Sequence, residues 1–178
     1  MHVFLTGSRN VGKTTIINNI LENLSDRFDI GGFVTFMGEE FEPGKNYVYI
    51  SRVDSRHLLE DLHDDTSKIK IALRDKTASS FTAYPKAFDD QGVDLLKDWE
   101  AKDLVIADEL GFMESDAFKF QEKIFECLDG HVPILGVIKP KSGPFLDAVR
   151  SHRNVYIIEV TKENRDTLEE LIIKKLRI

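Results

Sequence analysis

Residues 7–14 read Gly-Ser-Arg-Asn-Val-Gly-Lys-Thr and match G-x-x-x-x-G-K-S/T, a loop that cradles the phosphates of a nucleotide. Its glycines allow the backbone to turn tightly, so that several N–H groups point toward phosphate oxygens. The Lys13 ammonium can reach the β- and γ-phosphates, and the Thr14 hydroxyl can bind Mg²⁺. We therefore expect contacts to the nucleotide from Gly7, Ser8, Arg9, Asn10, Val11, Gly12, Lys13, Thr14 and Thr15.

A second candidate group of catalytic and metal-binding residues is the carboxylate pair Asp108 and Glu109, which follows the apolar run at 104–107. This run predicts a strand, so both carboxylates would lie at its carboxyl end, where open α/β sheets bind ligands. A nucleotide-hydrolysing site needs one carboxylate near Mg²⁺ and another to accept a proton from the attacking water. We therefore expect Thr14 and Asp108 to hold Mg²⁺, and Lys13 and Glu109 to be the catalytic residues.

The segments around the glycine loop fit this interpretation. Residues 2–6 form a short apolar run, as expected for a parallel strand that is covered on both faces. A helix is predicted after the loop, because apolar residues recur at helical spacing at Ile16, Ile17, Ile20, Leu21 and Leu24. A helix that begins at the loop directs its positive N-terminal end toward the phosphates. The order strand, glycine loop, helix is the context that this motif requires.

The rest of the chain alternates between strand and helix patterns, which predicts an α/β fold with a mostly parallel, doubly wound sheet. Expected strands cover 30–36, 47–52, 68–73, 104–108, 134–138 and 155–160. Expected helices cover 93–99, 117–128, 144–151 and 168–176, with a helical turn at 54–63. The short strands at 47–52 and 68–73 predict a small antiparallel edge, and the polar stretch 37–68 is interpreted as a surface excursion. At 178 residues, we expect a single domain over 1–178.

Composition narrows the classes of function. The formal net charge of −7 argues against an extended nucleic-acid surface, because such surfaces need clustered Lys and Arg. No apolar run approaches the ~20 residues that cross a bilayer, and a strand beginning at residue 2 leaves no room for a signal peptide. Cys127, the only cysteine, is interpreted as a core residue with a free thiol. We expect a cytoplasmic protein without membrane contacts, and the sequence identifies no partner proteins.

Three segments together resemble the THEP1-type nucleoside-triphosphatases, a family of P-loop NTPases. They are the glycine loop, the run Asp108-Glu109-Leu110-Gly111-Phe112-Met113-Glu114, and the run Thr161-Lys162-Glu163-Asn164-Arg165. The resemblance extends nearly from end to end of the chain. It implies a RecA-like P-loop core, and hydrolysis of ATP, GTP and other nucleoside triphosphates to the diphosphate with Mg²⁺.

Two positions depart from the pattern of that family. Phe112 stands where the family usually has Lys, so we expect the role of that lysine to be displaced or the turnover to be slower. Asn10 stands where the family usually has Gly, and Asn tolerates a left-handed backbone better than most residues. The segment 37–68 also matches the family poorly.

Further candidates follow the later strands. Asn164 and Arg165 come after the last expected strand, where we expect them to flank the nucleoside. The alternative is an ordinary helix start with Thr161 as its N-cap. Lys139 and Lys141 follow the expected strand at 134–138, and either can meet the γ-phosphate or be solvated in a polar loop.

Two other functions stay open at this point. A small-molecule or nucleoside kinase on the same core would need an acceptor pocket and an arginine-rich lid, for which Arg150 and Arg153 are the nearest candidates. A guanine-nucleotide switch is suggested by the run at 108–111, which satisfies D-x-x-G, but the chain has no N-K-x-D segment after the later strands.

Overall fold

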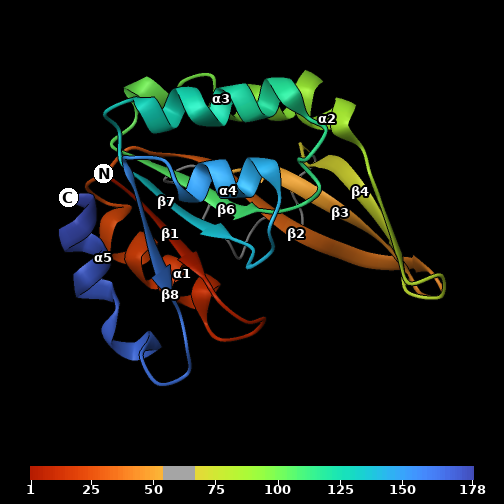
Figure 1. Cartoon of the computed structure of the whole chain (residues 1–178), viewed down its shortest axis with the longest axis horizontal. Helices are drawn as coiled ribbons and strands as arrows, with labels where there is room; N and C mark the ends of the chain where they lie inside the picture. Colours follow the sequence, from red (N-terminus) through yellow and green to blue (C-terminus); the bar gives the residue numbers. More distant parts are fainter. Residues whose placement is uncertain (54–66) are drawn as a thin grey trace.

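Within residues 1–53 and 67–178, which the computed structural model describes, eight strands form one sheet in the order β5-β4-β3-β2-β6-β7-β1-β8. The strands are β1 (His2–Thr6), β2 (Ile30–Glu42), β3 (Lys45–Arg52), β4 (Ile69–Asp75), β5 (Ser80–Ala83), β6 (Leu104–Leu110), β7 (Ile134–Ile138) and β8 (Val155–Glu159). Helices lie on both faces of this sheet, as Figure 1 shows. The expected doubly wound α/β architecture is therefore confirmed.

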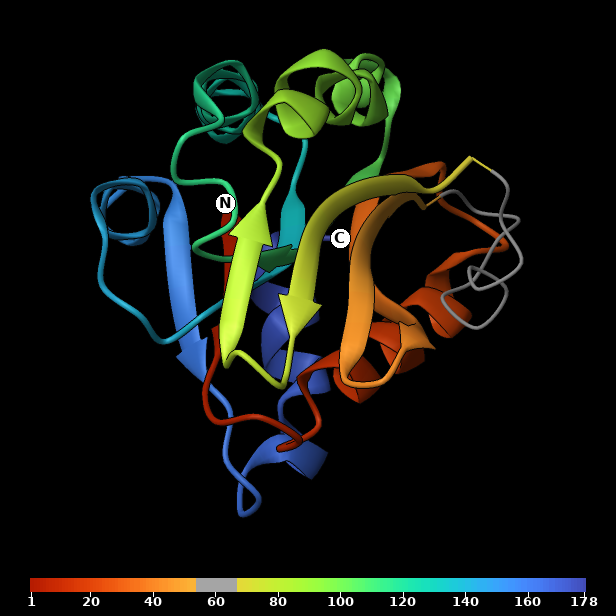
Figure 2. The ribbon, with the colours of Figure 1, turned by 90° about the vertical axis from the view of Figure 1, so that its right-hand side faces the viewer.

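Five α-helices and three short 3₁₀ helices accompany the sheet in the described residues. They are α1 (Lys13–Leu24), α2 (Pro85–Asp90), η2 (Gly92–Leu96), η3 (Trp99–Ala101), α3 (Phe118–Asp129), α4 (Pro144–Arg150), η4 (Arg165–Thr167) and α5 (Glu169–Leu176). One face of the sheet packs against α1 and α5, and the other against α2, α3 and α4 (Figures 1 and 2). The apolar spacing in the sequence marks the buried side of α1, and Cys127 is buried in α3 as expected.

The parallel part of the sheet positions the glycine loop and the carboxylates. Strands β2, β6, β7, β1 and β8 pair in parallel, so their carboxyl ends lie at one edge. Strand β1 leads into the glycine loop and has β8 on one side and β7, β6 and β2 on the other. The order of strands therefore changes direction at β1, which is where open α/β sheets form a ligand crevice. Strand β6 carries Asp108 and Glu109 to the same edge.

Strands β3, β4 and β5 extend the sheet beyond β2 as an antiparallel edge. This edge is larger than expected, because β2 continues through Glu42 and because β5 adds a strand that no sequence pattern indicates. The strand expected at 47–52 is confirmed within β3, whereas residues 37–42, interpreted as part of a surface excursion, continue β2 as a paired strand. Residues 39–43 are rich in glutamate because they form the exposed tip of the hairpin between β2 and β3.

The remaining expectations differ from the structure in small ways. The helix expected at 93–99 is split into η2 and η3, and the strand expected at 104–108 runs on through Leu110. The helical turn expected at 54–63 lies outside the described residues. In the part of the chain that is described, no helix combines the length and the apolar character that crossing a bilayer requires.

Candidate active site

The glycine loop turns sharply between β1 and α1. Its backbone has positive φ at Gly7 (133°), Asn10 (61°) and Gly12 (109°). A Cβ atom at Gly7 would lie 2.4 Å from the carbonyl oxygen of Val160, so the loop needs glycine there. Asn10 adopts a left-handed conformation, which Asn tolerates better than most residues other than glycine.

Lys13, the first residue of α1, folds its side chain back over the loop. Its ammonium donates to the carbonyl oxygens of Gly7 at 3.1 Å and Ser8 at 2.7 Å. Burial lowers the pKa of Lys13, and the nearby carboxylates of Glu109 and Asp108 act in the opposite direction. Hydrogen bonds between two charged groups are stronger than those to neutral carbonyls, so this ammonium is available to an anion.

Thr14 and Asp108 come together at the carboxyl edge of the sheet. Thr14 Oγ1 lies 3.5 Å from Asp108 Oδ2. Asp108 is only 5% exposed, and burial, reinforced by the charge of Glu109, raises the pKa of Asp108 to about 7. A hydroxyl oxygen beside a poorly hydrated carboxylate suits Mg²⁺, because this ion takes oxygen ligands and offsets the buried negative charge.

Glu109 forms an ion pair with Lys139, the residue that follows β7. Glu109 Oε1 lies 2.7 Å from Lys139 Nζ, and both side chains are 27% exposed. Both residues line the same cavity as Lys13. The structure thus brings the expected proton acceptor into contact with one of the two candidate lysines.

A cavity of about 700 Å³ is lined by Lys13, Thr14, Glu109 and Lys139, whereas the buried Asp108 is not among its lining residues. The glycine loop forms one wall, and the hairpin strands β2 to β5 form another. The charged residues of its lining are mostly basic, namely Arg9, Lys13, Arg74, Lys139, Lys141 and Arg165, and the one acidic lining residue in the described chain is Glu109. Because the whole chain carries a net charge of −7, this positive charge is concentrated locally. Such a cavity favours a multiply charged anion.

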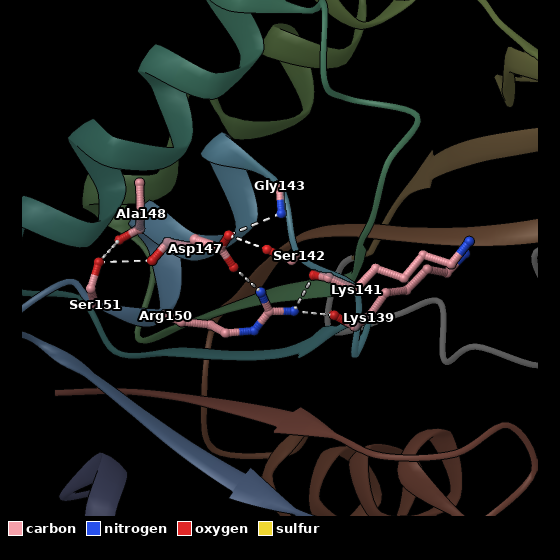
Figure 3. A network of polar contacts seen from close by, with 8 residues as sticks. All are labelled: Lys139, Lys141, Ser142, Gly143, Asp147, Ala148, Arg150 and Ser151. Carbon is pink, nitrogen blue, oxygen red and sulfur yellow. Dashed lines mark hydrogen bonds and ion pairs between the residues drawn. The ribbon is translucent and has the colours of Figure 1, made fainter.

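The loop between β7 and α4, which carries Lys139 and Lys141, is held by Arg150 (Figure 3). The Arg150 guanidinium donates to the carbonyl oxygens of both lysines, at 2.8 Å for Lys141. Asp147 accepts from Arg150 at 2.8 Å, and its second oxygen accepts from Ser142 at 2.6 Å. This network fixes the backbone of the loop while both lysine side chains extend away from it toward the cavity. Arg150 is therefore engaged within α4 and its loop, rather than placed in an open lid.

Phe112 lies beneath the two lysines of this loop. Lys139 Nζ is 5.4 Å and Lys141 Nζ 4.9 Å from the centre of the Phe112 ring. Phe81 of β5 packs edge-on against the same ring at 5.5 Å, and the Arg74 guanidinium lies 5.8 Å from the Phe81 ring. At position 112, which departs from the pattern of the resemblance, this chain therefore has an aromatic ring that supports two lysines from a neighbouring loop.

Asn164 and Arg165 take different places. The Asn164 side chain closes the turn after β8: its oxygen accepts the Thr161 N–H at 2.9 Å, and its amide donates to the Glu159 carbonyl at 2.9 Å. Asn164 does not line the cavity, whereas Arg165 does. A Cβ atom at Gly12 would lie 3.1 Å from Arg165 Cδ, so this side chain passes directly over the glycine loop.

Two residues of the glycine loop do not line the cavity. Val11 is 7% exposed and packs in the apolar core beside α1. Ser8 is exposed and takes part through its carbonyl oxygen, which accepts from Lys13. Either residue can still contact a phosphate through its backbone N–H.

Glu114, in the loop after β6, is fully buried. Its Oε2 accepts the Gly111 N–H at 2.9 Å, while Oε1 has no hydrogen-bond partner in the described residues. Burial raises the pKa of Glu114 to about 7. A buried carboxyl group thus fixes the turn that connects Glu109 to Phe112.

The sequence did not predict the wall of the cavity that strands β2 to β5 form. Thr35, Met37, Arg74 and Phe81 line it from β2, β4 and β5. These residue types are common in exposed strands, and their spacing carries no chemical signal. Only the pairing of the hairpin with the parallel sheet brings them opposite the glycine loop.

A family model described as NTPase matches residues 2–173. The chain belongs to this NTPase family. It is 28% identical to the nucleoside-triphosphatase THEP1 of Thermotoga maritima over 99% of this chain and 96% of the relative. It is 31% identical to the THEP1 of Archaeoglobus fulgidus over 93% of each chain. The THEP1-type resemblance seen in the sequence is therefore confirmed.

The fold agrees with that of a solved THEP1 structure. The crystal structure of THEP1 from Aquifex aeolicus superposes with a TM-score of 0.69 at 23% identity, and each chain is covered over 100% of its length. This likeness confirms the expected P-loop NTPase fold with its mostly parallel sheet and antiparallel edge.

Proposed function

We propose that this protein hydrolyses nucleoside triphosphates to the diphosphate and inorganic phosphate, with Mg²⁺ as cofactor. The observation that carries the proposal is that Lys13, Thr14 and Glu109 line one basic cavity, with the buried Asp108 3.5 Å from the Thr14 hydroxyl. Membership of the NTPase family and the names of its THEP1 relatives support it. The comparisons give no support to the kinase alternative.

Thr14 and Asp108 are the residues that would hold Mg²⁺. When bound, the ion offsets negative charge on the β- and γ-phosphate oxygens. The raised pKa of Asp108 fits this role, because the pocket disfavours its ionised form until a cation is present.

The chain's own residues divide the remaining work. Lys13 and the backbone N–H groups of the glycine loop hold the phosphates and stabilise the charge that develops during transfer. Glu109 orients a water molecule and accepts its proton as the water oxygen forms a bond to the γ-phosphorus. The bond from that phosphorus to the bridging oxygen breaks, and the diphosphate leaves with the electron pair.

We propose that the nucleoside lies on the side of the cavity where Arg165 crosses Gly12. Asn164 contributes there by fixing the turn that carries Arg165. Since the loop contacts phosphates rather than bases, we propose that ATP, GTP and other triphosphates are all accepted. A cytoplasmic location, a single domain over 1–178 and the lack of an extended nucleic-acid surface stay predictions from the sequence.

The proposal is tested by phosphate release from ATP, GTP, CTP and UTP, with no acceptor added, in Mg²⁺ and in EDTA. We expect release from several of these nucleotides in Mg²⁺ and none in EDTA. Lys13→Ala should abolish release, and Arg27→Ala, an exposed change in the turn that follows α1, is the matched control. Release only with an added acceptor would favour the kinase, and release from GTP alone would favour the guanine-nucleotide switch.

A further inference from the structure

The backbone of Lys139 is held by hydrogen bonds, whereas its side chain reaches Glu109 and the basic cavity. Its N–H donates to the Leu110 carbonyl at 3.0 Å, and its own carbonyl accepts from Arg150. The backbone is thereby tied to β6 and to α4, so any adjustment falls to the side chain. Its ammonium lies 2.7 Å from Glu109 Oε1 and faces the cavity that also holds Lys13.

This ion pair occupies the residue that the proposed hydrolysis needs as proton acceptor. The Lys139 ammonium occupies the Oε1 oxygen of Glu109, so it competes with a water molecule for that oxygen. A γ-phosphate entering the cavity would offer Lys139 a more highly charged partner than a single carboxylate. A diphosphate lacks that group and would leave the pair in place.

We propose that Lys139 is a γ-phosphate-binding residue that exchanges Glu109 for the γ-phosphate, so that Glu109 becomes available to water only when a triphosphate is bound. This inference rests on the proposed function. It makes the Lys139–Glu109 pair the element that distinguishes triphosphate from diphosphate. Phe112 supports the exchange, because its ring lies 5.4 Å from the ammonium and offers a face along which the side chain can move.

Lys141 provides a matched comparison. It belongs to the same loop, lies over the same Phe112 ring at 4.9 Å and has its carbonyl held by the same arginine. In the described part of the chain, however, Glu109 forms its ion pair with Lys139. Lys141→Met therefore removes a positive charge from the same loop without removing that pair.

The first experiment measures binding of a β,γ-imido triphosphate and of the diphosphate, both with Mg²⁺, by calorimetry. Lys139→Met should weaken binding of the triphosphate analogue roughly 10–100-fold, the range of a hydrogen bond to a charged group, and change diphosphate binding less than about threefold. Lys141→Met should preserve the wild-type preference for the triphosphate, and Lys139→Arg should restore most of it. Equal losses for both nucleotides, or none, would overturn the proposal.

The second experiment tests the exchange itself. If Glu109 competes with the γ-phosphate for Lys139, then Glu109→Gln should tighten binding of the triphosphate analogue more than binding of the diphosphate. This extra tightening should disappear in the Lys139→Met background. If it persists there, Glu109 acts only through general repulsion and the exchange is refuted. Both experiments use binding, so they are separate from the phosphate-release assay: a wild-type protein that releases no phosphate refutes the proposed hydrolysis instead.

Discussion

Thr14 and Asp108 are 94 residues apart in the chain, yet Thr14 Oγ1 lies 3.5 Å from Asp108 Oδ2. The first residue belongs to the helix after β1 and the second to β6, and β7 separates these two strands. A hydroxyl and a carboxylate thus meet where parallel strands end, with Thr14 on the lining of the basic cavity and Asp108 buried next to Thr14. The pairing gives the site a place for a divalent cation.

Asp108→Asn should impair the use of Mg²⁺. The amide keeps the shape of the side chain but removes the negative charge that would attract the ion. We expect the Mg²⁺ concentration for half-maximal phosphate release to rise at least roughly tenfold, as for other losses around metal sites. A Mg²⁺ titration of wild type and variant at saturating ATP measures this. An unchanged Mg²⁺ requirement would remove Asp108 from the metal site.

Glu109→Gln should separate binding from turnover. The amide cannot accept a proton from water, so turnover should fall roughly 10²–10⁴-fold, the usual contribution of a general base. The glycine loop is untouched, so the variant should still bind the triphosphate. Single-turnover phosphate release and calorimetry measure the two properties. Turnover like that of the wild type would rule out Glu109 as the base.

Glu114→Gln should flatten the dependence of stability on pH. Burial raises the pKa of Glu114 from 4.5 to about 7, so folding takes up a proton between these values. The free energy of unfolding of the wild type should therefore fall as pH rises through this window. Since Gln does not titrate, the fall should be smaller in the variant, by roughly 1–3 kcal/mol.

Denaturant unfolding between about pH 4.5 and about pH 8, in EDTA without nucleotide, provides the measurement for Glu114. Asp108 contributes in the same direction in both proteins and cancels in the difference. Glu39→Gln, at the exposed tip of β2, is the matched control and should reproduce the slope of the wild type. Identical slopes for wild type and Glu114→Gln would show that Glu114 is ionised in the folded chain.

Arg165 and Asn164 should behave differently when each is changed to Ala. Arg165 lines the cavity, so Arg165→Ala should raise KM for ATP and GTP by similar factors, with little change in stability. Asn164 makes two hydrogen bonds within the turn, so Asn164→Ala should lower the free energy of unfolding by about 1–2 kcal/mol. Steady-state kinetics with both nucleotides and thermal unfolding distinguish the two effects. An increase in KM from a fully stable Asn164→Ala would instead place Asn164 at the nucleotide.

Local patterns were sufficient wherever the signal is contiguous. The loop 7–14, the buried side of α1 and the strand that leads to Asp108 each depend on neighbouring residues, so their types and spacing predict them. The hairpin was harder. The acidic residues Glu39, Glu40 and Glu42 suggest a loop, but backbone pairing between β2 and β3 extends the ladder through Glu42, because hydrogen bonds of the main chain do not depend on the side chain.

The sequence by itself determined that a triphosphate-binding loop and a pair of carboxylates occur at strand ends, because both motifs are short and their chemistry is carried by residue type. Tertiary structure decided which groups meet there. It paired Glu109 with Lys139, set Phe112 under two lysines, and turned Asn164 into its own loop while Arg165 crossed Gly12. The contacts of Glu109 with Lys139, of Phe112 with the two lysines and of Arg165 with Gly12 join segments far apart in the chain, whereas the Asn164 bonds are local. The distant contacts follow from the order of strands in the sheet, which no local pattern specifies.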